Sequence, residues 1–499
     1  MEASTALEPR FRPRTSPFSI VLSFLMTLVI VVGFFVIWPE KFDHWFIYPV
    51  FACGFLIGID CFDWLTGSVD VFDPIGIFGT LGVYLFLVSP LLIVAFDYEM
   101  LHIHSPMDWR PWLGEMALYN FVGLIFYFVA RRFVPVYSKK INTRRWEINY
   151  KKAFIFIGIF LIFTGIIQIW FYARFGGIWN YMRVSRSQRH LLKGTGWITM
   201  LSESFPILMA FLYAIYKKKR NERISLVDLT VFLIFFFFAR LFFGGLKGSR
   251  STIIWALFWT VGVTHYMLRR IPRYVIYFGL FFLVIFSYGY GFYKTMGVEV
   301  FDSIRQGTTL ESLEQRTNRN SLVLLIADFS RSDVQAFFLY RLSLLEEDFP
   351  YAWGRTYLGA AFLIWPWQLW PSGLLGPKPA GVVKEGTNLE YGLDSYSRDF
   401  SSSRVYGLAG EAMVNFGPYS IPFFFFLFGL MISWVRQLCG SLHGSDIRLL
   451  MLPFLVNFCF NFFTGNTTNS VFFLVKNGAI PFLIILWCST RRTAPAEIR

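Results

Sequence analysis

The sequence predicts an all-α protein that crosses a membrane many times. Of its 499 residues, 55% are hydrophobic and only 16% are charged, whereas a soluble domain has about 25% charged residues. Lys and Arg number 46 and Asp and Glu 32. An apolar chain with a basic excess is typical of a polytopic membrane protein with positive cytoplasmic loops. The same composition excludes a water-soluble enzyme, a disordered protein and a nucleic-acid-binding protein.

Twelve apolar segments fit the length of a membrane-spanning helix, which is about 20 residues. We expect spans near 18–38, 45–62, 74–96, 113–130, 153–172, 196–216, 227–243, 252–268, 273–293, 419–438, 448–463 and 470–489. The first is too long for a cleaved signal peptide and lacks a small-residue cleavage site. The chain thus divides into a nine-span bundle (1–293), a large loop (294–418) and a three-span part of the same membrane domain (419–499).

Orientation follows from the short basic loops. With twelve spans, the basic residues near 10–14, 131–152, 217–223, 269–273 and 491–492 all fall on one side. Since short positive loops stay in the cytoplasm, both termini are predicted to be cytoplasmic. The 294–418 loop is then on the outer face of the membrane. It carries 11 basic and 14 acidic residues and no cysteine.

Three segments are distinguishable inside this loop. Residues 321–345 predict an amphipathic helix that ends at Glu346–Asp348. In 363–379 tryptophans alternate with prolines, which favours a position at the membrane interface. Residues 384–403 are polar and serine-rich, and we expect them to be mobile. The five cysteines of the chain are scattered through apolar runs and are predicted to be free thiols.

Two short outside loops are unexpectedly basic. Loop 173–195 contains Arg183, Arg186 and Arg189 at three-residue spacing and no acid, and loop 244–251 contains Lys247 and Arg250. Arginine suits the oxygens of a phosphate or diphosphate, and Gly244, Gly245 and Gly248 would let backbone N–H groups approach it. The alternatives are contacts with lipid headgroups, pairing with acids of the long loop, and snorkelling from a span end. Arg240 lies within a span and is expected to face the bundle interior.

The end of the long loop holds a second group of candidates. Arg398, Asp399, Arg404 and Glu411 precede a span on the outer face. An arginine beside a carboxylate there could clamp a diphosphate and supply a general base. The alternative is a structural Arg–Glu ion pair. We add Arg341, on the predicted helix 321–345, as a further ligand of the anion, and we predict no metal site.

Several motifs give the chain a resemblance to the Wzy-type bacterial oligosaccharide repeat-unit polymerases, which build O-antigen and enterobacterial common antigen. The resemblance spans most of the chain. It rests on DVFDPIGIFGTLGVYLFLVSPL (70–91), FGGIWNYMRVSRSQR (175–189), GGLKGSRS (244–251), YAWGRTYLGAAFLIWPWQLWPSGLLGPKP (351–379) and RVYGLAGEAMVNFGPYSIPFFFFLFGL (404–430). Where the family often has Pro-Arg, this chain has Pro366–Trp367.

The resemblance implies a GT-C-like helical fold and a metal-independent transfer without a cofactor. It also implies the inner membrane of a bacterium, with the 294–418 loop on the periplasmic face. The growing glycan would move from undecaprenyl diphosphate to a hydroxyl of the next lipid-linked unit. Glu411 or Asp399 would take the acceptor proton, and Arg404 with the basic loops would neutralise the diphosphate. A chain-length regulator and a flippase are the implied partners, besides the membrane lipids.

Three other functions stay open. A lipid-linked oligosaccharide flippase would use the basic loops as gates, although flippases usually show internal repetition and charges deep in their spans. An O-antigen ligase usually has a histidine-centred motif in its long loop, and 294–418 contains no histidine. A metal-dependent transferase using a lipid monophosphate would need an acidic pair, for which Glu40 and Asp43 are the only candidates in the first outside loop.

Overall fold

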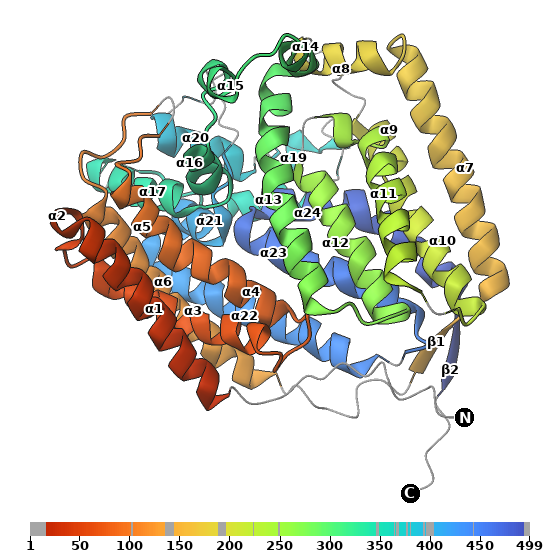
Figure 1. The fold of residues 1–499 in the computed structure, drawn as a ribbon, viewed down its shortest axis with the longest axis horizontal. Coiled ribbons are helices and arrows are strands. Elements are labelled where there is room, and N and C mark those ends of the chain that lie inside the picture. Colours follow the sequence, from red (N-terminus) through yellow and green to blue (C-terminus); the bar gives the residue numbers. More distant parts are fainter. Residues whose placement is uncertain are drawn as a thin grey trace, which may run out of the picture.

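The computed structural model describes residues 16–100, 103–134, 144–187, 196–222, 224–247, 250–345, 349–363, 365, 369–375, 378–379, 381–392, 395, 404–442 and 444–493. Within these ranges the chain is almost entirely helical. Figure 1 shows long helices running between two ends of the molecule. We call the end with α2, α8 and α14 the loop end, and the end with β1 and β2 the sheet end.

Eight stretches are long and apolar enough to cross a membrane. They are α1 (Pro17–Ile37), α3 (Ile47–Leu65), α4–η1–α5 (Pro74–Ala95), α6 (Arg110–Phe133), α7 (Tyr150–Arg174), α13 (Arg273–Met296), η8–α22 (Pro418–Ser441) and α24–η10–α25 (Thr467–Cys488). The prediction of a multi-pass, all-α membrane protein is confirmed at this level.

The other four predicted spans are also helical but do not meet the same criteria. They correspond to α10 (Phe205–Lys219), α11 (Leu226–Phe242), α12 (Arg250–Met267) and α23 (Leu452–Thr464). All four pack against neighbouring helices. The count of twelve spans and the GT-C-like architecture therefore remain predictions.

The remaining elements are short. They are α2 (Pro39–Phe42), α8 (Ile178–Ser187), α9 (Gly196–Ser202), η3 (Gly245–Lys247), α14 (Glu299–Arg305), α15 (Leu310–Thr317), α16 (Ser321–Val323), η4 (Leu324–Asp328), α17 (Ser332–Leu345), α18 (Arg355–Ala361), α19 (Ser372–Leu375), α20 (Val382–Tyr391), α21 (Gly407–Phe416) and η9 (Ile447–Leu450). Strands β1 (Arg144–Ile148) and β2 (Ser489–Thr493) pair antiparallel. Within the spans, η1 is Tyr84–Val88, η8 is Pro418–Ser420, η10 is Leu474–Gly478, and the helices around them are α4 (Pro74–Val83), α5 (Ser89–Ala95), α22 (Ile421–Ser441), α24 (Thr467–Phe473) and α25 (Ala479–Cys488).

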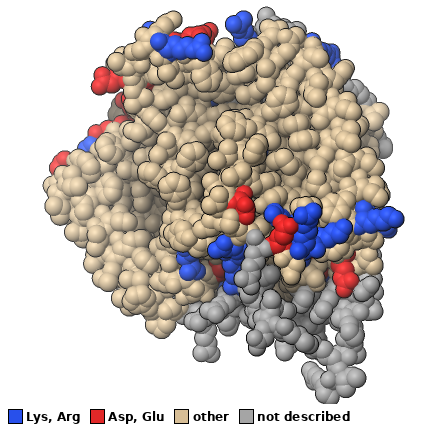
Figure 2. Space-filling model, turned by 45° about the vertical axis from the view of Figure 1, so that its right-hand side comes forward, with Lys and Arg blue, Asp and Glu red and all other residues tan. Residues whose placement is uncertain are grey.

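The surface separates into charged rims and an uncharged band. On the face in Figure 2, lysines, arginines and acids gather near the two ends, and the surface between them is largely without charge. The start of α1 and strand β2 both lie at the sheet end (Figure 1), so the described chain begins and ends on one side. This agrees with an even number of crossings. An apolar band of this kind is what a bilayer requires of the surface it covers.

Glycine allows the closest helix pair to form. A Cβ on Gly429 of α22 would lie 2.7 Å from the carbonyl oxygen of Tyr127 on α6, and one on Gly123 would lie 2.9 Å from the Phe425 ring. Small residues let backbones approach in membranes, where helix packing replaces the hydrophobic effect as the driving force. Buried residues of the N-terminal and C-terminal parts thus share one core.

Buried ion pairs connect the helices toward the sheet end. Arg131 Nη1 lies 2.6 Å from Asp60 Oδ2, and Arg436 Nε donates to Asp73 Oδ2 at 2.9 Å. Asp73 also caps α4 by accepting from the N–H of Ile75. Breaking one partner of such a pair leaves an uncompensated buried charge, at a cost of about 3–5 kcal/mol. These pairs fix the relative positions of α3, α4, α6 and α22.

Two predicted helices are broken by local chemistry. The expected span 196–216 is two helices, α9 and α10, separated at Glu203–Ser204. Pro206 occupies the first turn of α10, where its missing N–H is tolerated, whereas inside one continuous helix it would remove a backbone hydrogen bond and clash with the carbonyl four residues before it. The predicted amphipathic helix 321–345 is likewise divided. Residues 329–331, between η4 and α17, are not helical.

The predicted mobile segment 384–403 is only partly described, and its described part is ordered. Residues up to Tyr391 belong to α20, and Leu389 and Glu390 on that helix are buried. The expectation of mobility is therefore wrong for this part. The serines of the segment all follow α20, and the serine-free part before them packs against α17 and α21.

Candidate anion-binding site where the long loop meets the spans

Two π-helical segments lie against each other where the long loop meets the spans. Tyr84 of η1 donates its hydroxyl to the carbonyl of Leu325 in η4, and Ser332 donates to the carbonyl of Leu85 in η1 at 2.8 Å. A π-helical turn frees backbone carbonyls from the regular i→i−4 pattern, and such turns are frequent at functional sites. A hydroxyl of η1 therefore satisfies a carbonyl of η4, and a hydroxyl at the start of α17 satisfies a carbonyl of η1.

A group of charged side chains surrounds the end of η4, and we call it the arginine cluster. Its members are Arg250, Arg319, Asp328, Arg331, Asp333 and Arg404. The cluster combines the beginning of α12, the segment after α15, the η4–α17 junction and the approach to α21. Four cations against two carboxylates leave a positive excess.

Asp328 is shared by two arginines. Arg250 Nη2 lies 2.8 Å from Asp328 Oδ2, and Arg319 Nη1 lies 3.1 Å from the same oxygen. The Arg250 guanidinium also lies over the ring of Phe329, 5.6 Å from its centroid. One carboxylate cannot neutralise two guanidinium groups, so this part of the cluster keeps a net positive charge.

Arg331 has only neutral partners among the described residues. Its Nε donates to the carbonyl of Thr464 at 2.9 Å, and its Nη1 donates to the carbonyl of Ser330. Burial lowers the pKa of Arg331, against the opposing effects of Asp333 and Asp328. A half-buried guanidinium that no carboxylate neutralises is a favourable partner for an anionic ligand.

Asp333 is the carboxyl group of the cluster best suited to exchange a proton. It lies in the first turn of α17 and is almost fully buried. Burial raises the pKa of Asp333 to about 6, although Arg404, 3.7 Å away, acts to lower it. A carboxyl group with a pKa near neutrality meets the requirement for a general base.

Glu411, the carboxylate favoured by the sequence as a base, is fully enclosed by hydrogen bonds. It is 2% exposed. Its Oε1 accepts from the hydroxyl of Thr356 at 2.9 Å and its Oε2 from the N–H of Thr467 at 2.6 Å. Asn415 donates to the same threonine hydroxyl at 2.7 Å. The geometry is that of a clamp that holds α18, α21 and the start of α24 together.

Glu411 and Arg404 do not pair with each other. Arg404 faces Asp333 instead, so the alternative of an Arg404–Glu411 ion pair is wrong. The clamp and the cluster still meet at one turn, because Arg331 binds the carbonyl of Thr464 and Glu411 binds the N–H of Thr467.

The structure places the other predicted site residues in different surroundings. Arg250 joins the cluster, whereas Arg341 donates its Nε to the carbonyl of Leu389 at 3.1 Å and holds α17 against α20. Arg183 is exposed on α8. The side chains of Arg186 and Lys247 lie outside the described residues, and so do Arg189, Arg398 and Asp399 altogether.

Gly244 serves a different purpose from the predicted approach of phosphate. Its φ is +103°, and a Cβ there would lie 2.5 Å from the carboxyl carbon of Glu203. The missing side chain makes room for a carboxylate of the protein itself. Arg240 faces the bundle interior as expected, and its Nη2 lies 3.3 Å from Glu203 Oε2. The Nζ of Lys476 lies 2.5 Å from the same oxygen, so three charges are buried together.

Sequence reasoning missed Asp328, Arg331 and Asp333. The available signal was the string Asp-Phe-Ser-Arg-Ser-Asp at 328–333, which interrupts an otherwise apolar helix with three charges and two serines. It was attributed to the polar face of one amphipathic helix. Arg319 lacks any comparable local signal, because its importance depends on contact with Asp328.

No family model matches this sequence, and no curated protein or solved structure is similar to it. Among the described residues, no group of three or more His, Cys, Asp or Glu side chains is placed to hold a metal ion. The five cysteines are free and buried, as predicted. The site is therefore interpreted from its own geometry.

Proposed function

We propose that the chain is a membrane glycosyltransferase that polymerises repeat units linked to undecaprenyl diphosphate. The observation that carries this proposal is the arginine cluster: four guanidinium groups around two carboxylates, where an extramembrane loop meets the spans. A diphosphate diester carries a negative charge on each phosphorus. It matches the positive excess of the cluster in both sign and size.

The cluster would favour transfer by stabilising the leaving group. The acceptor hydroxyl attacks the anomeric carbon of the growing glycan, and the bond from that carbon to the diphosphate oxygen breaks. The diphosphate leaves with the electron pair, and the hydroxyl proton passes to Asp333. Arg250, Arg319 and Arg331 would hold the diphosphate, since fixed cations placed where charge develops lower the barrier.

The division of roles follows from the neighbours of each group. Burial raises the pKa of both carboxyl groups, but Asp333 lies in the arginine cluster, 3.7 Å from Arg404, whereas Glu411 lies outside the cluster and accepts from Thr356 and Thr467. We therefore assign the proton transfer to Asp333. Glu411 is assigned a structural role, because its hydrogen bonds hold α18, α21 and the start of α24 together. The resemblance to repeat-unit polymerases supports the same substrate class.

The test is reconstitution. Lipid-linked repeat units are isolated from cells of the source organism that lack this chain, and purified protein in lipid nanodiscs is supplied with them, with and without a chelator. A ladder of glycan lengths that survives the chelator is expected, and Arg331→Gln should form the ladder more slowly than the wild type. Transfer of a single unit, or none, by a folded wild-type protein contradicts the proposal.

A second function is favoured by one observation. Glu203, Arg240 and Lys476 are buried together beside the spans, and charges in that position often mark transport pathways. A lipid-linked oligosaccharide flippase would use them to pass a polar headgroup. Proteoliposomes that translocate labelled lipid-linked units without lengthening the glycan would establish this function in place of the polymerase.

A further inference from the structure

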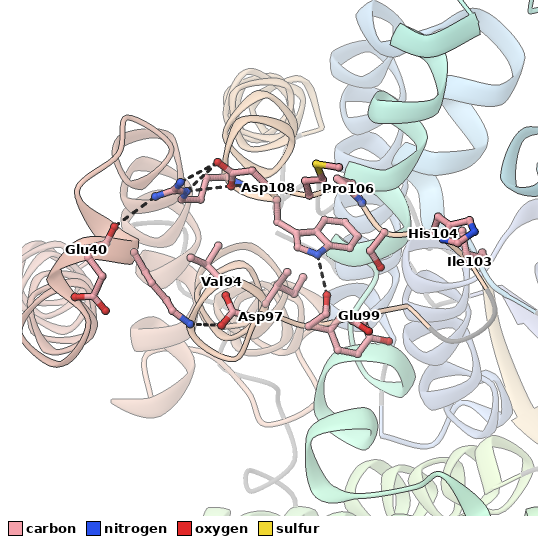
Figure 3. A pocket seen from close by; sticks show the side chains of 15 residues that line it. Glu40, Val94, Asp97, Glu99, Ile103, His104, Pro106 and Asp108 are labelled. Atoms are coloured by element: carbon pink, nitrogen blue, oxygen red, sulfur yellow. Dashed lines mark hydrogen bonds and ion pairs between the residues drawn. The ribbon is translucent and has the colours of Figure 1, made fainter.

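A cavity of about 620 Å³ opens at the loop end, beside the arginine cluster but outside it. Its walls come from α2, the end of α5, the following loop and the start of α6. Figure 3 shows the lining from Glu40 on one side to His104 on the other. Ligand pockets have volumes of about 300–1,000 Å³, so the cavity has the size of a site for an organic ligand.

Two ion pairs hold the wall of the cavity in place, and because each pair is neutral they add no net charge to it. Lys41 pairs with Asp97, and Arg110 Nη2 lies 2.9 Å from Asp108 Oδ2. Both pairs are drawn as dashed lines in Figure 3. They join α2 to the end of α5 and fix the start of α6.

Two further carboxylates remain to face a ligand. Glu40 and Glu99 line the cavity and are exposed. Neither has a salt-bridge partner in the part of the chain that the structure describes. The lining therefore carries an excess of negative charge, in contrast to the arginine cluster.

Apart from the imidazole of His104, the rest of the lining is apolar or hydroxylic. Ile93, Val94, Ile103 and Pro106 contribute apolar surface, and Ser105 contributes a hydroxyl. Carboxylates accept hydrogen bonds from hydroxyl groups, and apolar side chains pack on the C–H faces of sugar rings. The negative excess opposes phosphorylated or acidic sugars.

Tyr98 connects the cavity to the cluster. It lines the cavity and is only 4% exposed, and its phenol has no hydrogen-bond partner among the residues that the structure describes. The charges of Asp333 and Arg404 both act on that phenol. Buried hydroxyls are almost always hydrogen-bonded, so an unsatisfied one between a cavity and a base indicates that a ligand group completes it.

We propose that this cavity binds neutral or amino-bearing sugar residues of the acceptor, the incoming lipid-linked unit. Glu40 and Glu99 would accept hydrogen bonds from its hydroxyl or amino groups. Tyr98 would be a positioning residue that directs the attacking hydroxyl toward Asp333. The inference rests on the proposed function, because it takes the acceptor to be a lipid-linked glycan.

The test measures binding of the glycan without its lipid. The probe is the oligosaccharide that mild acid releases from the accumulated lipid-linked units, titrated by calorimetry into the purified full chain in nanodiscs. We expect saturable binding that weakens at least tenfold in the double variant Glu40→Gln, Glu99→Gln. Asp43→Asn is the matched control, because Asp43 is an exposed acid near α2 that does not line the cavity.

Tyr98→Phe tests the positioning role, since it removes only the hydroxyl. It should lower kcat of polymerisation at least tenfold while the Kd for the released glycan changes less than threefold. An unchanged kcat in this variant overturns the role given to Tyr98.

The outcomes separate the inference from the proposed function. Absence of binding by the wild type, or equal binding by the double variant, overturns the cavity assignment even if the protein forms a ladder. Binding that depends on Glu40 and Glu99 in a protein that forms no ladder supports the cavity and contradicts the polymerase.

Discussion

Asp333 and Arg404 face each other at 3.7 Å across the junction between α17 and the approach to α21. Asp333 lies in the first half of the long loop and Arg404 near its end, so their contact joins two distant parts of the loop. The pair also sets the proton affinity of the carboxyl group, since Arg404 is the main influence that lowers the pKa of Asp333 against the effect of burial. The first prediction follows from this relationship.

The rate of polymerisation should depend on pH through Asp333. A base is active when deprotonated, so with a pKa of about 6 the rate should rise toward neutral pH and fall about tenfold per unit well below the pKa. Arg404→Gln removes the charge that lowers the pKa, so the acidic limb should move to higher pH. Rates from pH 5 to 8 check this, with Arg316→Gln, an exposed arginine on α15, as control. An acidic limb that stays in place excludes Asp333 as the base.

Arg331 should bind the diphosphate. Arg331→Gln removes a charge-assisted hydrogen bond, which contributes about 1.5–3 kcal/mol, so affinity for undecaprenyl diphosphate should fall about tenfold to a hundredfold. Inhibition of the ladder by added undecaprenyl diphosphate measures this affinity. Arg316→Gln again provides the control. Equal inhibition constants for the two variants would show that the cluster is not the diphosphate site.

Glu411 should act on stability rather than on chemistry. Glu411→Ala leaves the N–H of Thr467 and the hydroxyl of Thr356 without their acceptor, and each buried unsatisfied group costs about 1–3 kcal/mol. We expect a lower Tm and a lower yield of folded protein, with activity per folded molecule largely retained. Thermal unfolding in detergent, combined with activity normalised to folded protein, decides this. Loss of activity at unchanged Tm would return Glu411 to the role of base.

The membrane-spanning character was predictable because it depends on composition. Apolar segments such as 18–38 and 153–172 can be recognised without knowledge of tertiary contacts, and both are long helices in the structure. The break at Glu203–Ser204 was harder to predict. Pro206 was a visible signal, but the partners that stabilise a carboxylate at that point, Arg240 and Lys476, belong to other spans.

The site was predictable only in part, for the same reason. Arg250 was predictable because a positive charge in a short outside loop is unusual by itself, and Arg404 because it lies near Glu411 just before a span. Asp333 and Arg331 became candidates only when folding placed them beside those arginines and buried them. Periodicity cannot reveal a carboxyl group whose pKa is raised by its neighbours, because those neighbours come from distant parts of the chain.

Orientation is testable with cysteine labelling, since the five native cysteines are buried. Asp43→Cys at the loop end should react with an impermeant maleimide in intact spheroplasts. Lys151 is exposed at the start of α7, and the exposed Arg220 directly follows α10. The variants Lys151→Cys and Arg220→Cys should react only after lysis. Labelling of Arg220→Cys in intact spheroplasts would show that α10 does not cross and would contradict twelve spans.

The buried group of Glu203, Arg240 and Lys476 should respond asymmetrically to substitution. Glu203 Oε2 lies 3.3 Å from Arg240 Nη2 and 2.5 Å from Lys476 Nζ, so both described cations share this carboxylate. Glu203→Ala removes the shared carboxylate, and the loss of one partner of a buried ion pair costs about 3–5 kcal/mol. Lys476→Met should cost less, because Arg240 keeps the carboxylate paired and also donates to the carbonyls of Glu203 and Phe243.

Unfolding in detergent should therefore give a lower Tm for Glu203→Ala than for Lys476→Met. Asp302→Ala, an exposed acid on α14, should leave the Tm unchanged. Equal and small shifts in the first two variants would mean that water reaches these charges, the result expected of a transport pathway and not of a structural ion group.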